Sequence, residues 1–152
     1  MKKFKFKLDP LLNYRKYQER IAQQKTAKAH LEVKTCEEQI INLDQMKHLN
    51  AQNIETIVSK GVSASVFRQY HQYSQSLEGS IKEEKIRKIH LEKILQEKLL
   101  ELKKKTIDKK AMEIYRKKLR AQYTQEAAAD EQKNQDEISS LKTARTISNE
   151  TL

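Results

Sequence analysis

Residues 19–43 read ERIAQQKTAKAHLEVKTCEEQIINL, and their small and apolar side chains recur at alternating steps of three and four. This spacing places them on one face of an α-helix, where they form the seam of a coiled coil. The same frame extends in both directions and weakens where charged or amide residues enter it. The predicted seam consists of Leu8, Leu12, Arg15, Glu19, Ala22, Thr26, Ala29, Val33, Cys36, Ile40, Leu43, Lys47, Asn50, Ile54 and Ile57.

The sequence also predicts where this helix begins and ends. Asp9 can accept hydrogen bonds from unpaired amides at a helix start, and Pro10 suits the first helical position. Gly61 can take the left-handed conformation that ends a helix, and Ser63 can cap the next one. We therefore predict a first helix over about 9–58, a hinge over about 59–63 and a second helix over about 64–138.

The second helix carries a similar seam, although more of its positions are charged. Gly79 lies inside it, at a cost of about 1 kcal/mol relative to alanine. Beyond residue 102 two apolar rows compete: one of Ile107, Ala111, Ile114, Lys118 and Ala121, and a flanking row of Met112, Tyr115 and Leu119. We assign the first row to the seam. The preceding positions are Phe67, Tyr70, Ser74, Leu77, Ile81, Glu84, Lys88, Leu91, Leu95, Lys98 and Leu102.

The composition supports a helical rather than a sheet protein. The 152 residues include two glycines, one proline and no tryptophan, too few turn formers for a sandwich or barrel. Hydrophobic residues make up 37% and charged residues 34%, which is typical of a long helix or coiled coil. The predicted fold class is all-α, a long two-helix antiparallel coiled-coil hairpin. We expect one domain over residues 1–140 and a flexible tail over 141–152.

The net charge of +10 is concentrated in two segments. Residues 1–20 carry a net charge of +5 and residues 82–120 carry +8, whereas 21–81 are neutral and 121–152 carry −3. An antiparallel hairpin places the two basic segments side by side. Helix charges often form only a solvated face, but this asymmetry also favours an acidic partner.

The sequence offers little for catalysis, cofactors or metals. Gly61 and Gly79 lie outside any phosphate-binding loop motif, and His30, His48, His71 and His90 lack metal-ligand spacing. A thin hairpin provides no concave pocket, so we expect no enzyme and no cofactor. The single Cys36 excludes an intramolecular disulfide framework and fits a reducing cytoplasm. The N-terminus lacks a secretory signal, and no apolar run is long enough to span a membrane.

Two groups of apolar residues have open interpretations. Phe67, Tyr70, Tyr73 and Leu77 lie just after the hinge, and they either lock the hinge end of the hairpin or form a docking surface. Further apolar residues lie off the seams, which is more than a two-helix coil needs and suggests a third surface covered by another chain or by self-association. These residues are Leu11, Tyr14, Tyr17, Ile21, Tyr115, Leu119 and Tyr123.

The N-terminal run Phe4-Lys5-Phe6-Lys7-Leu8-Asp9-Pro10-Leu11-Leu12-Asn13-Tyr14-Arg15 resembles the start of the FliJ family of the flagellar type III export apparatus. That family opens with F-x-F-x-L-x-x-L-L-x-x-R, a pattern that this run matches. Glu19, Ala22, Ala29, Gly61, Tyr70, Tyr73, Leu77 and Glu113, together with a later acidic pair (Asp130-Glu131 or Asp136-Glu137), also fit. The resemblance covers residues 4 to about 138, and its distinctive part is the N-terminal run. Related injectisome proteins share the shape and size but usually match that run less well.

The resemblance implies a non-enzymatic coiled coil similar to the central stalk of rotary ATPases. Its implied partners are the hexameric flagellar export ATPase, the cytoplasmic part of the membrane export gate, and export chaperones. The implied location is the cytoplasm, with peripheral association at the inner-membrane export apparatus. Candidate gate residues are Leu11, Tyr14, Arg15 and Gln18. Candidate ATPase-ring residues are Lys104, Lys105, Lys109, Lys110, Arg116, Lys117, Lys118 and Arg120.

Two other functions remain open from the sequence. The positive charge allows a nucleic-acid-binding coiled coil, although aromatic residues are not interleaved with basic ones on a platform and acidic residues remain dense in the basic segment. The periodicity also allows a structural coiled coil that assembles with itself. Salt-dependent duplex binding would favour the first, and a concentration-dependent mass would favour the second.

Overall fold

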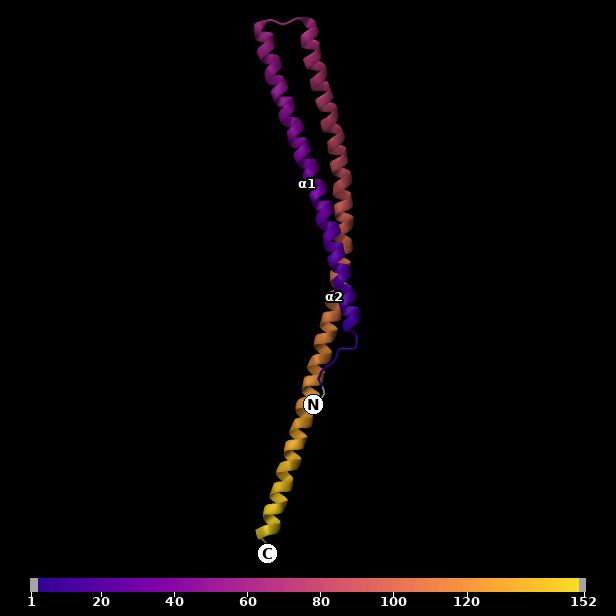
Figure 1. Ribbon diagram of the computed structural model, residues 1–152, viewed down its shortest axis with the longest axis vertical. Helices are drawn as coiled ribbons and strands as arrows, with labels where there is room; N and C mark the ends of the chain where they lie inside the picture. Colours follow the sequence, from indigo (N-terminus) through magenta and orange to yellow (C-terminus); the bar gives the residue numbers. More distant parts are fainter. Residues whose placement is uncertain (1–2, 151–152) are drawn as a thin grey trace. The chain divides into compact units, whose positions relative to one another are not determined.

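The computed structural model describes residues 3–150 and contains two long helices joined by a short loop (Figure 1). Helix α1 spans Asp9–Lys60 and helix α2 spans Ala64–Glu150. Cross-helix contacts pair early residues of α1 with late residues of α2, so the helices are antiparallel. The predicted all-α helical hairpin is confirmed, and the described residues contain no strand.

The chain divides into two compact units, each of which contains part of both helices. The hinge unit comprises residues 18–105, and the described part of the terminal unit comprises residues 3–17 and 106–150. The proposal of one domain over 1–140 stays a prediction, because this division does not test whether the units fold together. Each unit is therefore described by itself.

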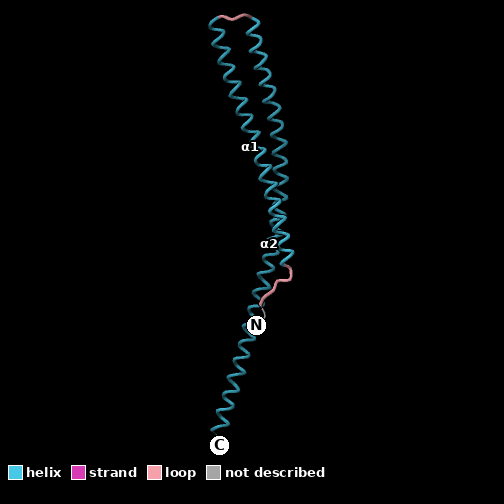
Figure 2. Tube along the Cα trace, viewed as in Figure 1, coloured by secondary structure: helices cyan, strands magenta, loops and turns pink. Residues whose placement is uncertain are grey.

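A short loop joins α1 and α2 in the hinge unit (Figure 2), and its hydrogen bonds follow the predicted capping chemistry. Gly61 has a φ of +79°, which favours glycine, and its amide donates to the Val58 carbonyl at 3.3 Å. The Ser63 hydroxyl accepts a hydrogen bond from the Val66 amide at 3.4 Å, as expected of a helix cap. The loop is confined to residues 61–63, inside the predicted hinge.

Helix α1 begins at Asp9, as predicted, but its capping position differs from the prediction by one residue. The Leu12 amide donates to the Leu8 carbonyl at 2.9 Å, which makes Leu8 rather than Asp9 the capping position. Asp9 instead lies in the first helical turn, where its negative charge is favourable against the helix dipole.

The predicted α1 seam is confirmed from Leu12 to Ile57, where every predicted position is buried or half-buried. Only Leu8, at its start, is exposed. The seam is narrow and mixed in character, because its most buried members include small side chains and two polar ones. The buried seam residues of α1 are Leu12, Glu19, Ala22, Ala29, Val33, Cys36 and Asn50.

The α2 seam is confirmed from Tyr70 to Leu102, but Phe67 is exposed and the predicted continuation is wrong. The row of Ile107, Ala111, Ile114, Lys118 and Ala121 is exposed. The frame instead continues at the same steps of three and four through Lys105, Lys109, Met112, Arg116, Leu119 and Tyr123. Long cationic side chains can occupy such positions because their aliphatic stems cover apolar surface while the charge stays in water.

The C-terminal end of α2 also differs from the prediction. The sequence places the end of this helix near residue 138, whereas α2 continues to Glu150. Every described side chain from residue 128 to 149 is exposed, so this stretch contributes nothing to the core of the terminal unit. The flexibility of residues 141–152 stays a prediction.

Asn50 fixes the alignment of the two helices in the hinge unit, and its replacement is our first prediction. Its side-chain amide is buried and donates to the Tyr70 carbonyl of α2 at 3.1 Å. A single buried amide in a coiled-coil seam specifies register at a cost in stability. We expect Asn50→Leu to raise the free energy of unfolding by about 1 kcal/mol and the melting midpoint by about 3 °C. Circular dichroism melting measures both.

The control for this prediction is Asn53→Leu, because Asn53 lies on the same helix but is exposed. We expect this control to leave the melting midpoint within about 1 °C of the wild type. A lower midpoint for Asn50→Leu than for Asn53→Leu would show that the amide stabilises the hairpin outright.

Candidate functional site: a partner interface

The N-terminal strap, residues 3–8, packs on α2 in the terminal unit and is a loop that ends in a turn at residues 7–8 rather than a helix (Figure 2). Phe6 is buried with Leu12 and Met112, and Phe4 and Leu119 pack against this cluster. The sequence F-K-F-K alternates, so a period of two turns both phenylalanines toward α2 while Lys3, Lys5 and Lys7 stay exposed.

Ring contacts hold the strap to α2. The Phe4 and Tyr123 rings are tilted with centroids 5.6 Å apart, and the Phe6 and Tyr115 rings meet edge to face at 6.1 Å. The Arg116 guanidinium lies 6.0 Å from the Phe6 ring centroid. Such pairs add stability beyond the area that they bury.

Two polar contacts fix the start of α1 against α2 in the same unit. The Asp9 carboxylate pairs with the Arg116 Nε at 3.5 Å, and Arg15 donates to the Asp108 carbonyl at 2.8 Å. These contacts place Asp9 beside Arg116 and Arg15 beside Asp108. They also occupy two residues that the sequence assigned to partners, Arg15 and Arg116.

A groove of about 550 Å³ lies between the strap and α2. Apolar rings form much of its wall, and lysines of the strap lie at its edge. Its lining residues are Lys3, Phe4, Lys5, Phe6, Lys7, Leu8, Tyr115, Leu119, Gln122, Tyr123 and Glu126. The sequence grouped Tyr115, Leu119 and Tyr123 as off-seam apolar residues for another chain to cover, but in the structure the strap of the same chain packs against them. Helix spacing does not show that a non-helical segment packs here.

The eight candidate ATPase-ring residues fall into two groups. Lys110, Lys117, Lys118 and Arg120 are exposed in the terminal unit, and Lys104 is exposed in the hinge unit. The other three lie in the α2 seam frame: Lys105 and Lys109 are half-buried, and Arg116 contacts Asp9 and Phe6. The exposed four of the terminal unit form its cationic surface.

The candidate gate residues are also divided. Leu11 and Tyr14 are exposed in the terminal unit, and Arg15 is held by Asp108. Gln18 is half-buried and belongs to the hinge unit. The structure therefore brings only Leu11 and Tyr14 to an open surface.

The aromatic cluster after the hinge is half core and half surface. Leu77 is buried and Tyr70 is half-buried, whereas Phe67 and Tyr73 are exposed. Phe67 stacks on the His71 ring at 6.4 Å between centroids. Both interpretations offered by the sequence thus remain, with Leu77 packed inside and Tyr73 facing out.

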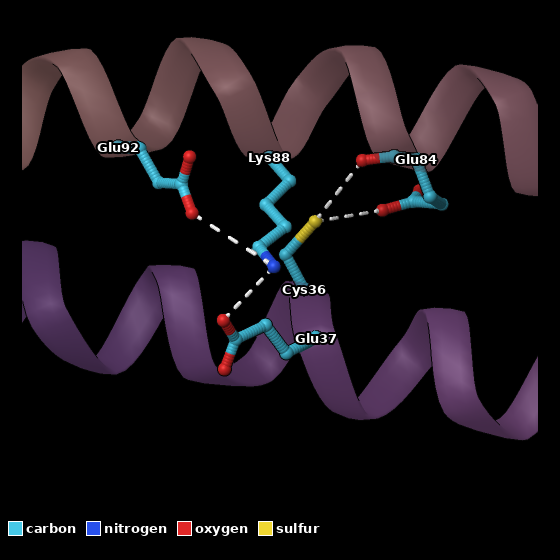
Figure 3. A network of polar contacts seen from close by, with 5 residues as sticks. All are labelled: Cys36, Glu37, Glu84, Lys88 and Glu92. Carbon is cyan, nitrogen blue, oxygen red and sulfur yellow. Dashed lines mark hydrogen bonds and ion pairs between the residues drawn. The ribbon is translucent and has the colours of Figure 1, made fainter.

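Cys36 is the centre of a polar network across the seam of the hinge unit (Figure 3). Its thiol lies 3.3 Å from the Glu84 carbonyl and 3.4 Å from Oε2 of the same residue, and donates toward both. Lys88 reaches across to Glu37 of α1 at 3.1 Å and also pairs with Glu92 of its own helix at 3.8 Å. Burial first, and then the hydrogen bond and charge of Glu84, raise the pKa of the Cys36 thiol, against smaller opposing effects of Arg87 and Lys88.

The raised pKa of Cys36 predicts a loss of stability at alkaline pH. A thiol whose pKa is higher in the folded state stabilises that state fully below its unfolded pKa, and this stabilisation is lost as the pH rises through the folded value. We therefore expect the free energy of unfolding to fall above pH 9.0, the ordinary pKa of this thiol. Denaturant titrations between pH 8 and 11 measure this dependence.

Cys36→Ala is the control for this pH dependence, because it removes the titrating group. Contacts with Glu37 also raise the pKa of Lys88 from 10.5, so both proteins should lose stability near the top of the range. Only the wild type should already lose stability as the pH rises above 9.0. Equal slopes between pH 9 and 10 in the two proteins would refute the assignment to Cys36.

Residues 3–150 contain no group of three or more histidine, cysteine, aspartate or glutamate side chains placed to hold a metal ion. Neither α1 nor the described length of α2 has a stretch long and apolar enough to cross a membrane.

The fold and the site define a basic antiparallel coiled-coil protein with a strapped N-terminus. The family described as flagellar FliJ protein matches residues 4–148, nearly the whole chain, and the protein belongs to the FliJ family. This membership supports a role related to flagellar export, in a family of non-enzymatic export components. Comparisons with curated proteins and with solved structures gave no match.

Proposed function

We propose that this protein is a non-enzymatic stalk of the flagellar type III export apparatus that promotes assembly and activity of the export-ATPase ring. It contacts the membrane export gate and escorts export chaperones, and it works in the cytoplasm at the inner-membrane export apparatus. Family membership supports the export role, and the cationic surface of the terminal unit supports the ring contact.

The proposed contact with the ATPase ring rests on a division among the cations of the terminal unit. Some of them contact other residues of the unit, and others are exposed and available to the ring. Arg116 and Arg15 are engaged inside the terminal unit, which fixes the strap and the start of α1. Lys110, Lys117 and Lys118 stay exposed on the helix that this packing supports. A fixed row of cations can steer and hold an acidic pore lining more effectively than charges on a loose chain.

Leu11 and Tyr14 are the proposed gate contacts, because they are exposed apolar side chains next to the packed Leu12. Apolar and aromatic residues of this kind supply most of the binding energy at protein interfaces. Arg15 and Gln18 then act by positioning α1 rather than by touching the gate.

The test of the ring contact is ATP hydrolysis by the purified export ATPase, titrated with this protein at low and physiological salt. We expect stimulation that saturates at a fixed ratio of protein to ring. We then replace Lys110, Lys117, Lys118 and Arg120 with glutamine. The concentration of this protein that gives half-maximal stimulation should rise by about tenfold or more, because four exposed cations are lost. The matched control replaces Arg20, Lys25, Lys28 and Lys34, which are exposed in the hinge unit.

The control variant separates local contact from net charge, since both variants lose four positive charges. Equal weakening by the two variants would show that only net charge matters. Absence of stimulation at any ratio would remove the stalk proposal and leave the gate and chaperone contacts. A duplex-DNA arm at the same salt concentrations tests the competing nucleic-acid function.

A further inference from the structure

The outer row of α2 in the hinge unit consists of seven exposed residues at alternating steps of four and three. They are Lys82, Ile86, Ile89, Lys93, Gln96, Leu100 and Lys103. At 100° per residue the middle of this row lies about 140° around the helix from the middle of the seam that α2 packs on α1, which carries Ile81, Lys88 and Leu95. Its three aliphatic side chains are 61–69% exposed, the level of side chains with almost no covering atoms.

The spacing of the outer row is that of a coiled-coil seam rather than of scattered surface residues. The outward side of α1 offers a comparison in the same unit. Leu31, Ile41 and Leu49 are 56–63% exposed, but they do not share one row of threes and fours. The regular row is therefore a property of α2 and not of exposed apolar residues in general.

The outer row is cationic and contains no carboxylate. Of the carboxylates in this stretch of α2, Glu84 pairs with Arg87, Glu92 with Lys88, and Glu101 with Lys98, while Glu83 and Glu97 are exposed beside the row rather than in it. Lys82, Lys93 and Lys103 thus alternate with Ile86, Ile89 and Leu100. An apolar row flanked by cations complements an apolar row flanked by anions.

We propose that the outer row of α2 is a docking surface for an acidic amphipathic helix of a partner protein, which packs there as a third helix. A second copy of this chain fits less well, because its own outer row would bring three more lysines and no carboxylate against Lys82, Lys93 and Lys103. An anionic membrane fits less well too. A membrane-binding helix needs a broad apolar face with aromatic residues, whereas this row is one seam wide. The proposal goes beyond the ring contact, which uses other residues.

The test measures binding of a labelled helical peptide of about four heptads, with leucine at the seam positions and glutamate beside them. We expect saturable binding to the full-length protein that weakens with salt. Ile86→Ser/Ile89→Ser/Leu100→Ser should weaken it by about tenfold or more, because three apolar anchors are lost. Leu31→Ser/Ile41→Ser/Leu49→Ser is the matched control and should bind as the wild type does.

Two further measurements locate the peptide. Lys82→Gln/Lys93→Gln/Lys103→Gln keeps the apolar residues and should reduce both the affinity and its salt dependence. A photo-crosslinker at Gln96, inside the row, should capture the peptide, whereas one at Gln45, exposed on α1, should not. Equal helicity of all variants by circular dichroism shows that they remain folded.

Several results would overturn the proposal. A scrambled acidic peptide that binds equally well would show simple charge attraction, and equal loss in the α1 control would show no preference for the row. Crosslinking at Gln45 would place the peptide elsewhere. If the α2 triple variant abolishes binding to anionic vesicles, or abolishes a concentration-dependent mass, while peptide binding is unchanged, the surface serves a membrane or a second copy instead.

Discussion

Replacing Leu12 with alanine is expected to release the strap and the start of α1 from α2. Leu12 is 1% exposed and packs with Phe6 and Met112, the two other buried residues of this cluster. Truncation of a buried leucine costs about 2–5 kcal/mol, partly through the cavity that it leaves. Because the cluster is so small, we expect the terminal unit to lose most of its packing. Amide hydrogen exchange at residues 112–123 measures this loss.

Leu11→Ala is the control for Leu12→Ala, since it removes the same atoms from the neighbouring position. Leu11 is 39% exposed, so its truncation should cost roughly 1 kcal/mol or less. Exchange in the hinge unit should be unchanged by either substitution. Equal protection of residues 112–123 in the two variants would mean that the buried cluster does not hold this unit together.

Placing aspartate at Ile81 is expected to unfold much of the hinge unit. Ile81 is 8% exposed on the face of α2 that packs on α1. An aspartate there loses the burial of an isoleucine and places a carboxylate where it is largely shielded from water. We expect a cost on the order of 4 kcal/mol. Loss of helical signal by circular dichroism at room temperature, or a large drop in the melting midpoint, measures it.

Ile86→Asp provides a stringent comparison, because it makes the same chemical change five residues further along the same helix. Ile86 is 69% exposed, so we expect a change within about 0.5 kcal/mol. Were Ile86→Asp as damaging as Ile81→Asp, the two faces of α2 would have to be reassigned. The pair thus tests the orientation of α2 on which the docking proposal depends.

Local signals explain why most of the fold could be predicted from sequence. The α1 seam persists over many turns in one frame, and a long frame tolerates single exceptions such as Lys47 and Asn50. The hinge depends on residues whose preferences are nearly independent of context: Gly61 for a positive φ and Ser63 for capping. These features need no knowledge of the rest of the chain.

Beyond Leu102 the predicted seam followed the most apolar row of side chains. The residues that are buried there belong to a different row. Burial depends on what lies across from a side chain, and in the terminal unit the strap lies across from α2. The frame of Lys109 and Met112 is turned toward the packing of this unit, while Ile107 and Ile114 face water. A hydrophobicity pattern cannot identify a non-helical segment of residues 3–8 as the covering element, because that segment has no helical period.

The sequence predicts which residues of the candidate site are basic, but not which of them are already paired within the protein. The sequence marks residues 82–120 as basic, yet it does not show which cations are already engaged. Arg116 pairs with Asp9, which is 107 residues away in sequence, so only the fold distinguishes it from Lys117. The regular outer row of α2 was equally readable in principle.

The exposed end of α2 has a further consequence for how proteases cleave this protein in solution. Residues 128–149 bury no described side chain, so their helix is supported only by local hydrogen bonds and intrinsic propensity. Such a helix opens and closes readily without any change in the rest of the chain. We expect proteases to nick this stretch first and to leave a trimmed product that melts at the same temperature as the intact protein.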